Sequence, residues 1–221
     1  MYLYTVTGAV GEEGYLDLAK SGDLTGKNVY VNMTNKCPCS CVFCLRQTKQ
    51  QQEGNTLWLK EGEPSVETML SLFAKYDLSV INELVFCGFG EPTERLADLT
   101  ALLKYVKETH PGVKTRVNTN GLSDLAYGRD TAPDFGGGIL DTISISMNAS
   151  NKERYLELTR SKFGIQSYDA MLKFAVDCKQ YVPNVVLTVV DHVEDSEEIK
   201  KCRAICDKLG LHLRVRVYED K

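Results

Sequence analysis

The sequence has no long hydrophobic run. No window approaches the ~18 consecutive apolar residues of a membrane-spanning helix. The N-terminal segment MYLYTVTGAVGEEGYLDL has neither a basic region nor an apolar core, so it is not a secretory signal. We therefore expect a cytoplasmic protein, in a compartment where thiols stay reduced.

Clusters of basic residues and internal repeats are also missing. The formal net charge is −4, and no stretch concentrates Lys and Arg, which argues against a nucleic-acid-binding surface. The 221 residues contain no repeated unit, and 43% of them are hydrophobic. This composition is ordinary for a globular protein and allows one domain with a sizeable core.

Cysteine, by contrast, is abundant and unevenly distributed. Four of the eight cysteines lie close together: Cys37, Cys39, Cys41 and Cys44. In a reducing compartment such crowding favours metal binding or core packing over disulfides. Cys202 and Cys206 form a further CxxxC pair, but they share a helical stripe with Ile199 and Leu209. We therefore expect this pair to pack in the core rather than to bind a second cluster.

Short runs rich in Val, Ile, Leu and Thr recur along the chain and predict strands. Most lack clean alternation, as expected for strands covered on both faces. They span residues 28–34, 82–87, 114–119, 141–147, 185–190 and 211–218.

The intervening segments carry helix signals. Ser65 is a candidate N-cap, and the apolar residues after Ser167 have helical spacing. Another helix is expected over residues 96–110, and a last one is capped by Asp195 and ended by Gly210. Strands alternating with helices predict an α/β fold with a parallel sheet and right-handed crossovers. A flat doubly wound sheet and a curled partial barrel both fit this alternation.

Cys37, Cys41 and Cys44 form a CxxxCxxC pattern just after the first predicted strand. Ligands of parallel sheets bind in the loops at the carboxyl ends of strands. Thiolates bind iron–sulfur clusters, and four irons usually take four cysteines, so three cysteines leave one iron open for chemistry. A zinc knuckle with Cys39 as fourth ligand is an alternative, as is plain packing. Zinc is less favoured because no second CxxC-type pair of that spacing follows.

The cysteine pattern, with Phe43 before its last cysteine, resembles the signature of the radical S-adenosylmethionine (radical SAM) superfamily. The resemblance continues through three further motifs at successive predicted strand ends. These are GFGEP at residues 88–92, NTNG at 118–121 and SISMN at 144–148. Four motifs in this order are far more specific than any one of them.

From about Asn28 onward, the chain most resembles the small TatD-linked radical SAM family, named for genes beside TatD-type nucleases. The segments that carry this match are CxFCxR at 41–46, CGFGEPTERL at 87–96, NTNGL and YGRD within 118–130, KFG at 162–164 and LTVVD at 187–191. The resemblance implies a partial (β/α)6 TIM-like barrel. It predicts a single domain over residues 28–221 with a short N-terminal extension, residues 1–27.

The resemblance also implies the chemistry and the cofactors. A [4Fe–4S] cluster held by Cys37, Cys41 and Cys44 would cleave S-adenosylmethionine to a deoxyadenosyl radical that abstracts hydrogen from a substrate. The substrate would be an unidentified small molecule or peptide, the electron donor a flavodoxin or ferredoxin, and a functional link to a TatD-type nuclease is implied. Two alternatives are an activase that makes a glycyl radical on a partner protein and a metal-binding module without catalysis.

Glu91 is the leading candidate for binding the cofactor. Its carboxylate and the carbonyl groups around Gly90 would accept hydrogen bonds from the amino group of the methionine moiety. Gly88 and Gly90 would let the backbone approach the cofactor closely. An ordinary glycine turn with an exposed acid is the alternative.

Other cofactor contacts follow from the same resemblance. Ser146 and Asn148 are the expected partners of the ribose hydroxyls, unless they only cap the next segment. The expected methionine-carboxylate contacts are Asn118 and Thr119, unless the segment with Asn120 and Gly121 is simply a turn. Arg160 or Lys162 would give cationic help, with a solvated surface charge as the alternative. Phe43, Val189 and Val190 would pack the adenine, although they are equally good core residues.

The last predicted strand has one basic face, formed by His212, Arg214, Arg216 and Tyr218. If its apolar face packs on helices, the basic face looks into the barrel and suits an anionic substrate group. Alternatively, these charges only protect an open edge strand from aggregation. Arg46, Arg129 and His192 are similar candidates with less support.

Overall fold

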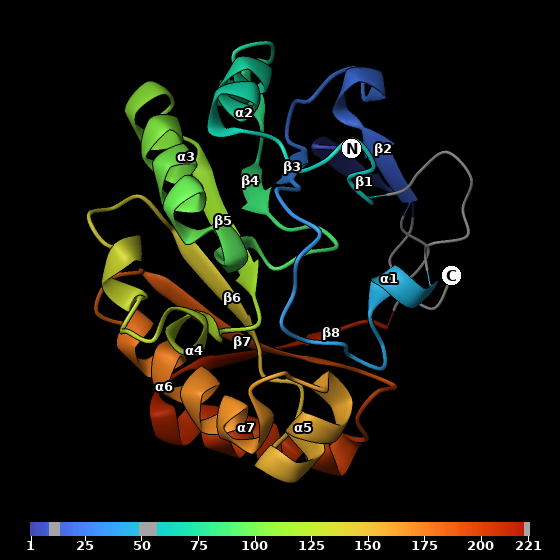
Figure 1. Ribbon diagram of the computed structural model, residues 1–221, viewed down its shortest axis with the longest axis vertical. Helices are drawn as coiled ribbons and strands as arrows, with labels where there is room; N and C mark the ends of the chain where they lie inside the picture. Colours follow the sequence, from blue (N-terminus) through green and yellow to red (C-terminus); the bar gives the residue numbers. More distant parts are fainter. Residues whose placement is uncertain (9–13, 49–56, 219–221) are drawn as a thin grey trace.

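All six predicted strands are present in one curved sheet. The computed structural model describes residues 1–8, 14–48 and 57–218 (Figure 1). Neighbouring strands run parallel and follow one another in chain order: β3 (Asn28–Val31), β4 (Glu83–Phe86), β5 (Lys114–Thr119), β6 (Thr142–Ser146), β7 (Asn184–Val190) and β8 (His212–Arg216). The sheet ends at β8 without closing, so the expected α/β partial barrel is confirmed.

Two further strands extend the sheet beyond β3. β1 (Leu3–Thr7) and β2 (Gly14–Asp17) form an antiparallel hairpin, and β1 pairs antiparallel with β3. Within the described residues, the sheet therefore has eight strands in the order β2-β1-β3-β4-β5-β6-β7-β8. The sequence predicted residues 1–27 only as an N-terminal extension. The boundary between this extension and the domain of residues 28–221 stays a prediction.

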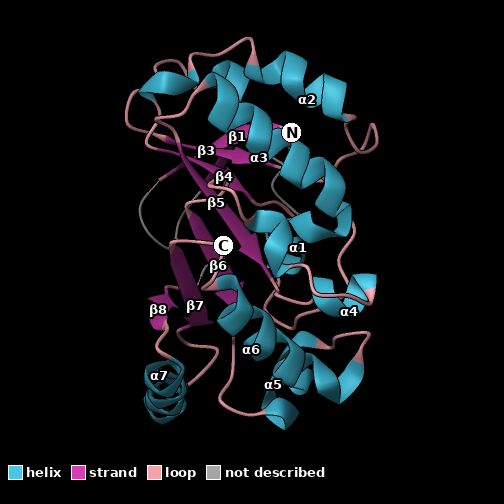
Figure 2. Ribbon diagram, turned by 90° about the vertical axis from the view of Figure 1, so that its left-hand side faces the viewer, coloured by secondary structure: helices cyan, strands magenta, loops and turns pink. Residues whose placement is uncertain are grey.

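Helices flank the sheet, and most of them cover its convex side. They are α1 (Leu45–Thr48), α2 (Val66–Phe73), α3 (Leu96–Thr109), α4 (Ser123–Tyr127), α5 (Lys152–Thr159), α6 (Ser167–Cys178) and α7 (Ser196–Leu209). Figure 1 shows α2, α3, α4 and α6 on the outer side, with α1 on the opposite side. Figure 2 shows α3 and α6 in front of the strands, with α4 to their right. No helix of the described ranges is long and apolar enough to cross a membrane.

The helix ends follow the predicted capping residues. Ser65 accepts a hydrogen bond from the backbone N–H of Thr68, and Asp195 accepts one from that of Glu198. Gly210 ends α7 in the left-handed conformation, at φ 62°. These contacts satisfy backbone groups that the helix itself leaves unpaired.

The Asp195 cap supports a stability prediction. Asp195→Ala removes the acceptor for the Glu198 N–H and should lower the free energy of unfolding by about 1 kcal/mol. Asp195→Asn keeps a good capping group and should remain close to the parent protein. Urea denaturation followed by circular dichroism measures both. Equal midpoints for the alanine and asparagine variants would contradict the capping role.

The strand register divides the sheet into two different faces. Paired residues of neighbouring strands point to the same side. Side chains toward the helices are apolar and fully buried, among them Val29, Val31, Leu84, Phe86, Val117, Ile143, Ile145 and Leu187. The concave face instead carries mainly polar groups, among them Glu83, Arg116, Asn118, Ser144, Ser146, Thr188, Arg214 and Arg216. The core thus lies under the helices, and the concave face is available for a site.

Cys202 and Cys206 lie on the core side of α7, as expected. Both are fully buried, and the Cys206 thiol lies 3.8 Å from the Met147 sulfur. They pack as small apolar residues.

Candidate functional site

The cysteine loop, defined here as residues 37–44, leaves β3 and crosses the concave side to reach α1 (Figure 1). The end of α5 holds this loop through the backbone. The Ser40 N–H donates to the Thr159 carbonyl at 2.9 Å, and the Val42 N–H donates to the Leu158 carbonyl at 2.9 Å. The loop is therefore attached to the helical layer as well as to the sheet.

The four thiols of the loop have different surroundings. Cys39 is buried, whereas the other three are partly buried. A hydrogen bond between the Cys39 and Cys37 thiols raises the pKa of Cys39 and lowers that of Cys37. Burial raises the pKa of the Cys44 thiol. The Asn120 side-chain amide lies 4.0 Å from the Cys37 sulfur and 3.9 Å from the Cys39 sulfur.

Glu91 connects the loop after β4 to the end of β5. Its Oε1 accepts from the Thr93 N–H (3.1 Å), the Thr93 hydroxyl (2.9 Å) and the Thr119 hydroxyl (2.7 Å). Its Oε2 accepts from the Asn120 N–H at 2.7 Å. The residue is buried, and desolvation raises the pKa of its carboxyl despite these donors. Glu91 is thus a buried link between two strand ends, not an exposed turn residue.

The Glu91 loop also contacts the cysteine loop directly. The Glu91 N–H donates to the Lys36 carbonyl at 2.8 Å, just before Cys37. The Lys162 N–H donates to the Pro38 carbonyl at 2.9 Å from the other side. Backbone hydrogen bonds therefore hold the chain on both sides of Cys37.

Gly88 and Gly90 are required by packing within the protein. A Cβ at Gly88 would lie 2.1 Å from the Asn32 Oδ1, and one at Gly90 would lie 2.1 Å from the Thr34 carbonyl oxygen. The expected reason for these glycines was close approach of the cofactor. That role stays a prediction, and the structure shows a further reason: the chain after β4 lies directly against the chain after β3.

Gly90→Ala should therefore destabilise the fold by about 3 kcal/mol, because the added methyl group meets backbone that cannot rotate away. Gly112→Ala is the matched control, since a Cβ there meets nothing within 4 Å. Thermal unfolding of both variants tests this. Equal melting temperatures for Gly90→Ala and Gly112→Ala would disprove the close contact.

The other predicted cofactor residues lie at successive strand ends. They differ in burial and in the hydrogen bonds that they already make. The amide oxygen of Asn118 is buried without a partner among the described groups, whereas the Thr119 hydroxyl already donates to Glu91. Ser146 is half-buried on the concave face of β6. Asn148 is buried and has φ 60°, a conformation that asparagine tolerates better than most residues.

Two cavities lie beside the cysteine loop. The first, of about 140 Å³, is lined by Phe43 and Val190 together with Cys41, Cys44 and Arg216. The second, of about 390 Å³, is lined by the following residues: Val42, Phe43, Arg154, Glu157, Leu158, Arg160, His192, Val193 and Tyr218. Phe43 lines both. The structure thus brings Phe43 and Val190 to the thiols, and it places Arg160 on the neighbouring cavity.

Several contacts of the site were not anticipated. Asn120 was expected only as a possible turn residue, yet it contacts both Glu91 and the thiols. Tyr155 of α5 has a fully buried hydroxyl without a described partner, and burial raises the pKa of this phenol. Arg46 donates to the Asn35 carbonyl and lies 4.9 Å above the Trp58 ring. These contacts position Arg46 next to the cysteine loop. The sequence had suggested instead that Arg46 binds an anionic group of the substrate, and this stays a prediction.

The donor set fits an iron–sulfur cluster better than a single zinc ion. A tetrahedral zinc site brings its sulfur ligands to about 3.8 Å from one another. Among the described residues, no three cysteine sulfurs lie within 4.8 Å of one another. Cys37, Cys41 and Cys44 are all partly accessible, so each sulfur can bind a separate iron of a cluster. The buried, unpartnered Asn118 oxygen offers an acceptor for a further polar ligand.

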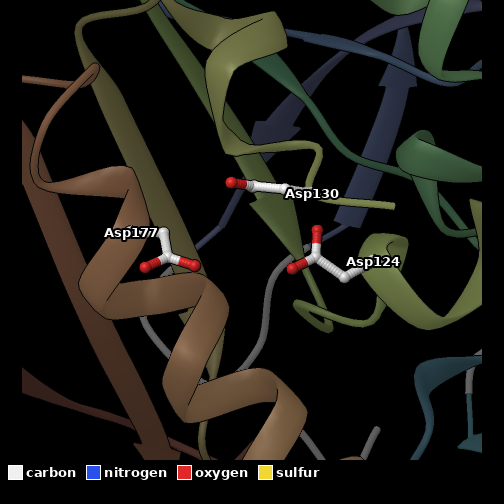
Figure 3. Close-up of side chains that lie close together, drawn as sticks. All are labelled: Asp124, Asp130 and Asp177. Atoms are coloured by element: carbon white, nitrogen blue, oxygen red, sulfur yellow. The ribbon is translucent and has the colours of Figure 1, made fainter. Parts of the chain in front are cut away.

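Three aspartates gather elsewhere, between α4 and α6. Asp124, Asp130 and Asp177 point toward one another, with carboxylate oxygens within 4.8 Å (Figure 3). Asp124 accepts from the Thr131 N–H and hydroxyl, and Lys173 pairs with both Asp124 and Asp177. The protein's own donors already engage these carboxylates, so we assign the cluster to joining α4 and α6.

Comparison with curated proteins gives two relatives. The Fe-coproporphyrin III synthase of Methanosarcina barkeri (strain Fusaro) is 33% identical over 90 residues, which are 41% of this chain and 20% of that protein. The probable GTP 3',8-cyclase of Thermococcus kodakarensis is 24% identical over 172 residues, which are 77% of this chain and 50% of that protein. The chain thus spans at most half the length of these relatives.

Comparison with solved structures supports the fold. The crystal structure of Streptococcus suis SuiB bound to S-adenosylmethionine matches with a TM-score of 0.63 and 16% identity. The match covers 87% of this chain and 40% of SuiB. At this identity the likeness concerns the fold alone.

The family itself is identified by its sequence profile. The profile of the radical SAM superfamily matches residues 31–204, which include the cysteine loop and every strand from β4 to β7. The chain therefore belongs to the radical SAM superfamily, whose members use a [4Fe–4S] cluster and S-adenosylmethionine.

Proposed function

We propose that this protein is a radical SAM enzyme that abstracts hydrogen from a small-molecule or peptide substrate. The observation that carries the proposal is the cysteine loop, whose partly buried Cys41 and Cys44 line a cavity together with Val190 and Arg216 of the concave face. Cys37, Cys41 and Cys44 would hold the cluster. When bound and reduced, the cluster supplies the electron that cleaves S-adenosylmethionine to methionine and a deoxyadenosyl radical.

The chain's own residues would orient the cofactor. Oε2 of Glu91 accepts only one hydrogen bond from the described groups, so it can accept another from the cofactor's amino group. The backbone carbonyl groups near Gly90 and the free amide oxygen of Asn118 add acceptors. Thr119 acts indirectly, because its hydroxyl holds Glu91 in place.

The remaining contacts would bind the nucleoside. Ser146 and Asn148, at the end of β6, would hydrogen-bond the ribose hydroxyls. Phe43 and Val190 line one cavity with the thiols, and they would pack the adenine and exclude water from the radical. Arg160 would contribute positive charge from the neighbouring cavity to the cofactor's carboxylate.

We propose the substrate and the partners from the solved structures and from the motifs of the sequence. A peptide substrate has a precedent in SuiB, whose structure is known with its precursor peptide SuiA. A flavodoxin or ferredoxin would supply the electron. The motifs shared with the TatD-linked family support membership of that family and a link to a TatD-type nuclease. Eight cysteines with no disulfide among them suit the reducing cytoplasm.

The activity is tested by reductive cleavage of S-adenosylmethionine. The protein is reconstituted anaerobically with iron and sulfide, reduced with dithionite and incubated with the cofactor. Formation of 5'-deoxyadenosine that depends on reductant and cluster supports the proposal. A cluster-loaded protein that never forms it, with or without candidate substrates, supports the non-catalytic metal-binding module instead. Hydrogen loss from a partner polypeptide would favour the glycyl-radical activase.

A further inference from the structure

The concave face carries an excess of positive charge. Between β3 and β8, Glu83 is the one acidic residue that the strand register places on this face. The same register places four permanent cations there: Lys114, Arg116, Arg214 and Arg216. Glu83 pairs with Arg116 at 3.0 Å, so its charge is already engaged.

Arg116 lies on β5, in the middle of the sheet, and only 12% of its side chain is exposed. Its Nε is buried and has no hydrogen-bond partner among the described groups. Solubility does not require a cation at such a position, because β5 has neighbouring strands on both sides. An arginine held there with a free donor suits recognition of an anion.

Arg214 reaches across the concave face from the edge strand β8. Its Nη2 donates to the Ser144 hydroxyl at 3.1 Å, although β7 lies between β8 and β6. The guanidinium therefore lies over the sheet and does not extend away from its edge. Partial desolvation lowers the pKa of Arg214, and the charges of Arg116 and Arg216 lower it further. Positive charges thus lie close together on this face, and a bound anion would stabilise them.

Arg216 connects this group to the cysteine loop. It lines the same cavity as Cys41, Phe43 and Cys44. Because Arg214 and Arg216 are two residues apart on one face of β8, the basic surface continues from the thiols toward the centre of the sheet. A molecule bound along it would lie beside the site at which the radical is proposed to form.

We propose that Arg116 and Arg214 bind an oxyanion group, carboxylate or phosphate, of the substrate, with Arg216 between this group and the cysteine loop. Guanidinium groups match the planar geometry of both anions and bind them through paired hydrogen bonds. The proposal rests on the proposed function for the identity of the bound molecule as a substrate. It names the class of that substrate: one that carries at least one carboxylate or phosphate.

The test is calorimetric titration of the full, cluster-loaded chain without reductant. S-adenosylmethionine is present throughout, so that the sites for the cofactor's own carboxylate are filled. Inorganic phosphate is titrated in one arm and acetate in the other, at constant ionic strength. The arm with the lower Kd identifies phosphate or carboxylate as the preferred group.

We expect saturable binding in at least one arm, and a Kd raised at least 10-fold in Arg214→Gln, because a charge-assisted hydrogen bond is lost. Arg214→Lys keeps the charge without the paired donors and should raise Kd less. Arg203→Gln, on the exposed side of α7, is the matched control and should leave Kd unchanged.

Two results would overturn the inference: no saturable binding of either anion to the wild-type chain, or equal Kd values for Arg214→Gln and Arg203→Gln. The first of these needs no variant, so it holds even where a substitution disturbs folding. Iron measured on the same samples reports on the proposed function separately. A chain that holds iron but binds no anion refutes only the anion site, and a chain without iron refutes the proposed function.

Discussion

Replacing Cys37, Cys41 or Cys44 with alanine, one at a time, is expected to abolish cluster assembly. Each thiol would hold a separate iron, and no other described thiol lies in the same loop with comparable exposure. After anaerobic reconstitution, iron should fall from about four atoms per chain to near zero. The characteristic visible absorption of the cluster should disappear in parallel.

Cys39→Ala is the matched control, because Cys39 belongs to the same loop and touches the same thiols. Its side chain is buried within the core and hydrogen-bonds to Cys37. We expect full iron content with a loss of stability of about 1 kcal/mol for the missing buried sulfur. An iron-replete Cys41→Ala variant would overturn the ligand assignment, and an iron-free Cys39→Ala variant would favour a four-thiol site.

Glu91→Ala is expected to lower the free energy of unfolding strongly. The substitution leaves four hydrogen bonds unmade, and the N–H groups of Thr93 and Asn120 lose their side-chain acceptor. An unsatisfied buried donor costs about 1–3 kcal/mol, so we expect a loss of about 3–5 kcal/mol in the free energy of unfolding. Chemical denaturation of the chain measures this loss.

Glu91→Gln separates the structural role from cofactor binding. Glutamine keeps one acceptor oxygen and the side-chain volume, so it should recover part of the stability. It carries no negative charge, and S-adenosylmethionine affinity should fall about 10-fold or more, since a charge-assisted hydrogen bond is lost. Equilibrium dialysis with labelled cofactor measures that affinity. Unchanged affinity in Glu91→Gln would remove Glu91 from the cofactor site.

The parallel strands and the helices α2, α3, α6 and α7 could be predicted because each carries a strong local signal. The strand from Lys114 to Thr119 begins and ends at the predicted residues. Ser65, Asp195 and Gly210 mark helix ends through their own hydrogen bonds or φ angle. Such signals act within a few residues, so one sequence is enough to reveal them. The barrel shape came instead from the resemblance, because alternation alone also fits a flat sheet.

The hairpin of β1 and β2 was missed because its signal is weak. The strands have five and four residues, and neither shows a clean alternating pattern of burial. Their stabilising contacts are distant in sequence: Tyr4 stacks on Tyr30, and its hydroxyl donates to the Cys87 carbonyl at 3.1 Å. Contacts of this kind are decided by the folded sheet rather than by local propensity.

The motifs could predict which residues belong to the candidate site, but they could not predict all the contacts of these residues. The motifs identified Glu91 and Gly90, yet the tight contact between Gly90 and Thr34 joins two loops far apart in the chain. Tyr155 lies on α5, a short polar helix that gave no clear amphipathic signal. Its place beside the cysteine loop therefore became visible only in the structure.

The basic face of β8 illustrates the same limit. The sequence showed that His212, Arg214 and Arg216 share a face, but it could not separate a substrate surface from a charged edge. The hydrogen bond from Arg214 to Ser144 favours the substrate surface, because it directs the guanidinium over the sheet. Arg116, which completes the group, lies about a hundred residues earlier and gave no signal of its own.

The most direct test of the central claim is electron paramagnetic resonance of the reduced, reconstituted protein with and without S-adenosylmethionine. If Cys37, Cys41 and Cys44 hold a cluster with one iron free of protein ligands, the spectrum of the reduced cluster should change when the cofactor is added. A [4Fe–4S] spectrum that is identical in the two samples, or a colourless protein that contains zinc, would contradict the account.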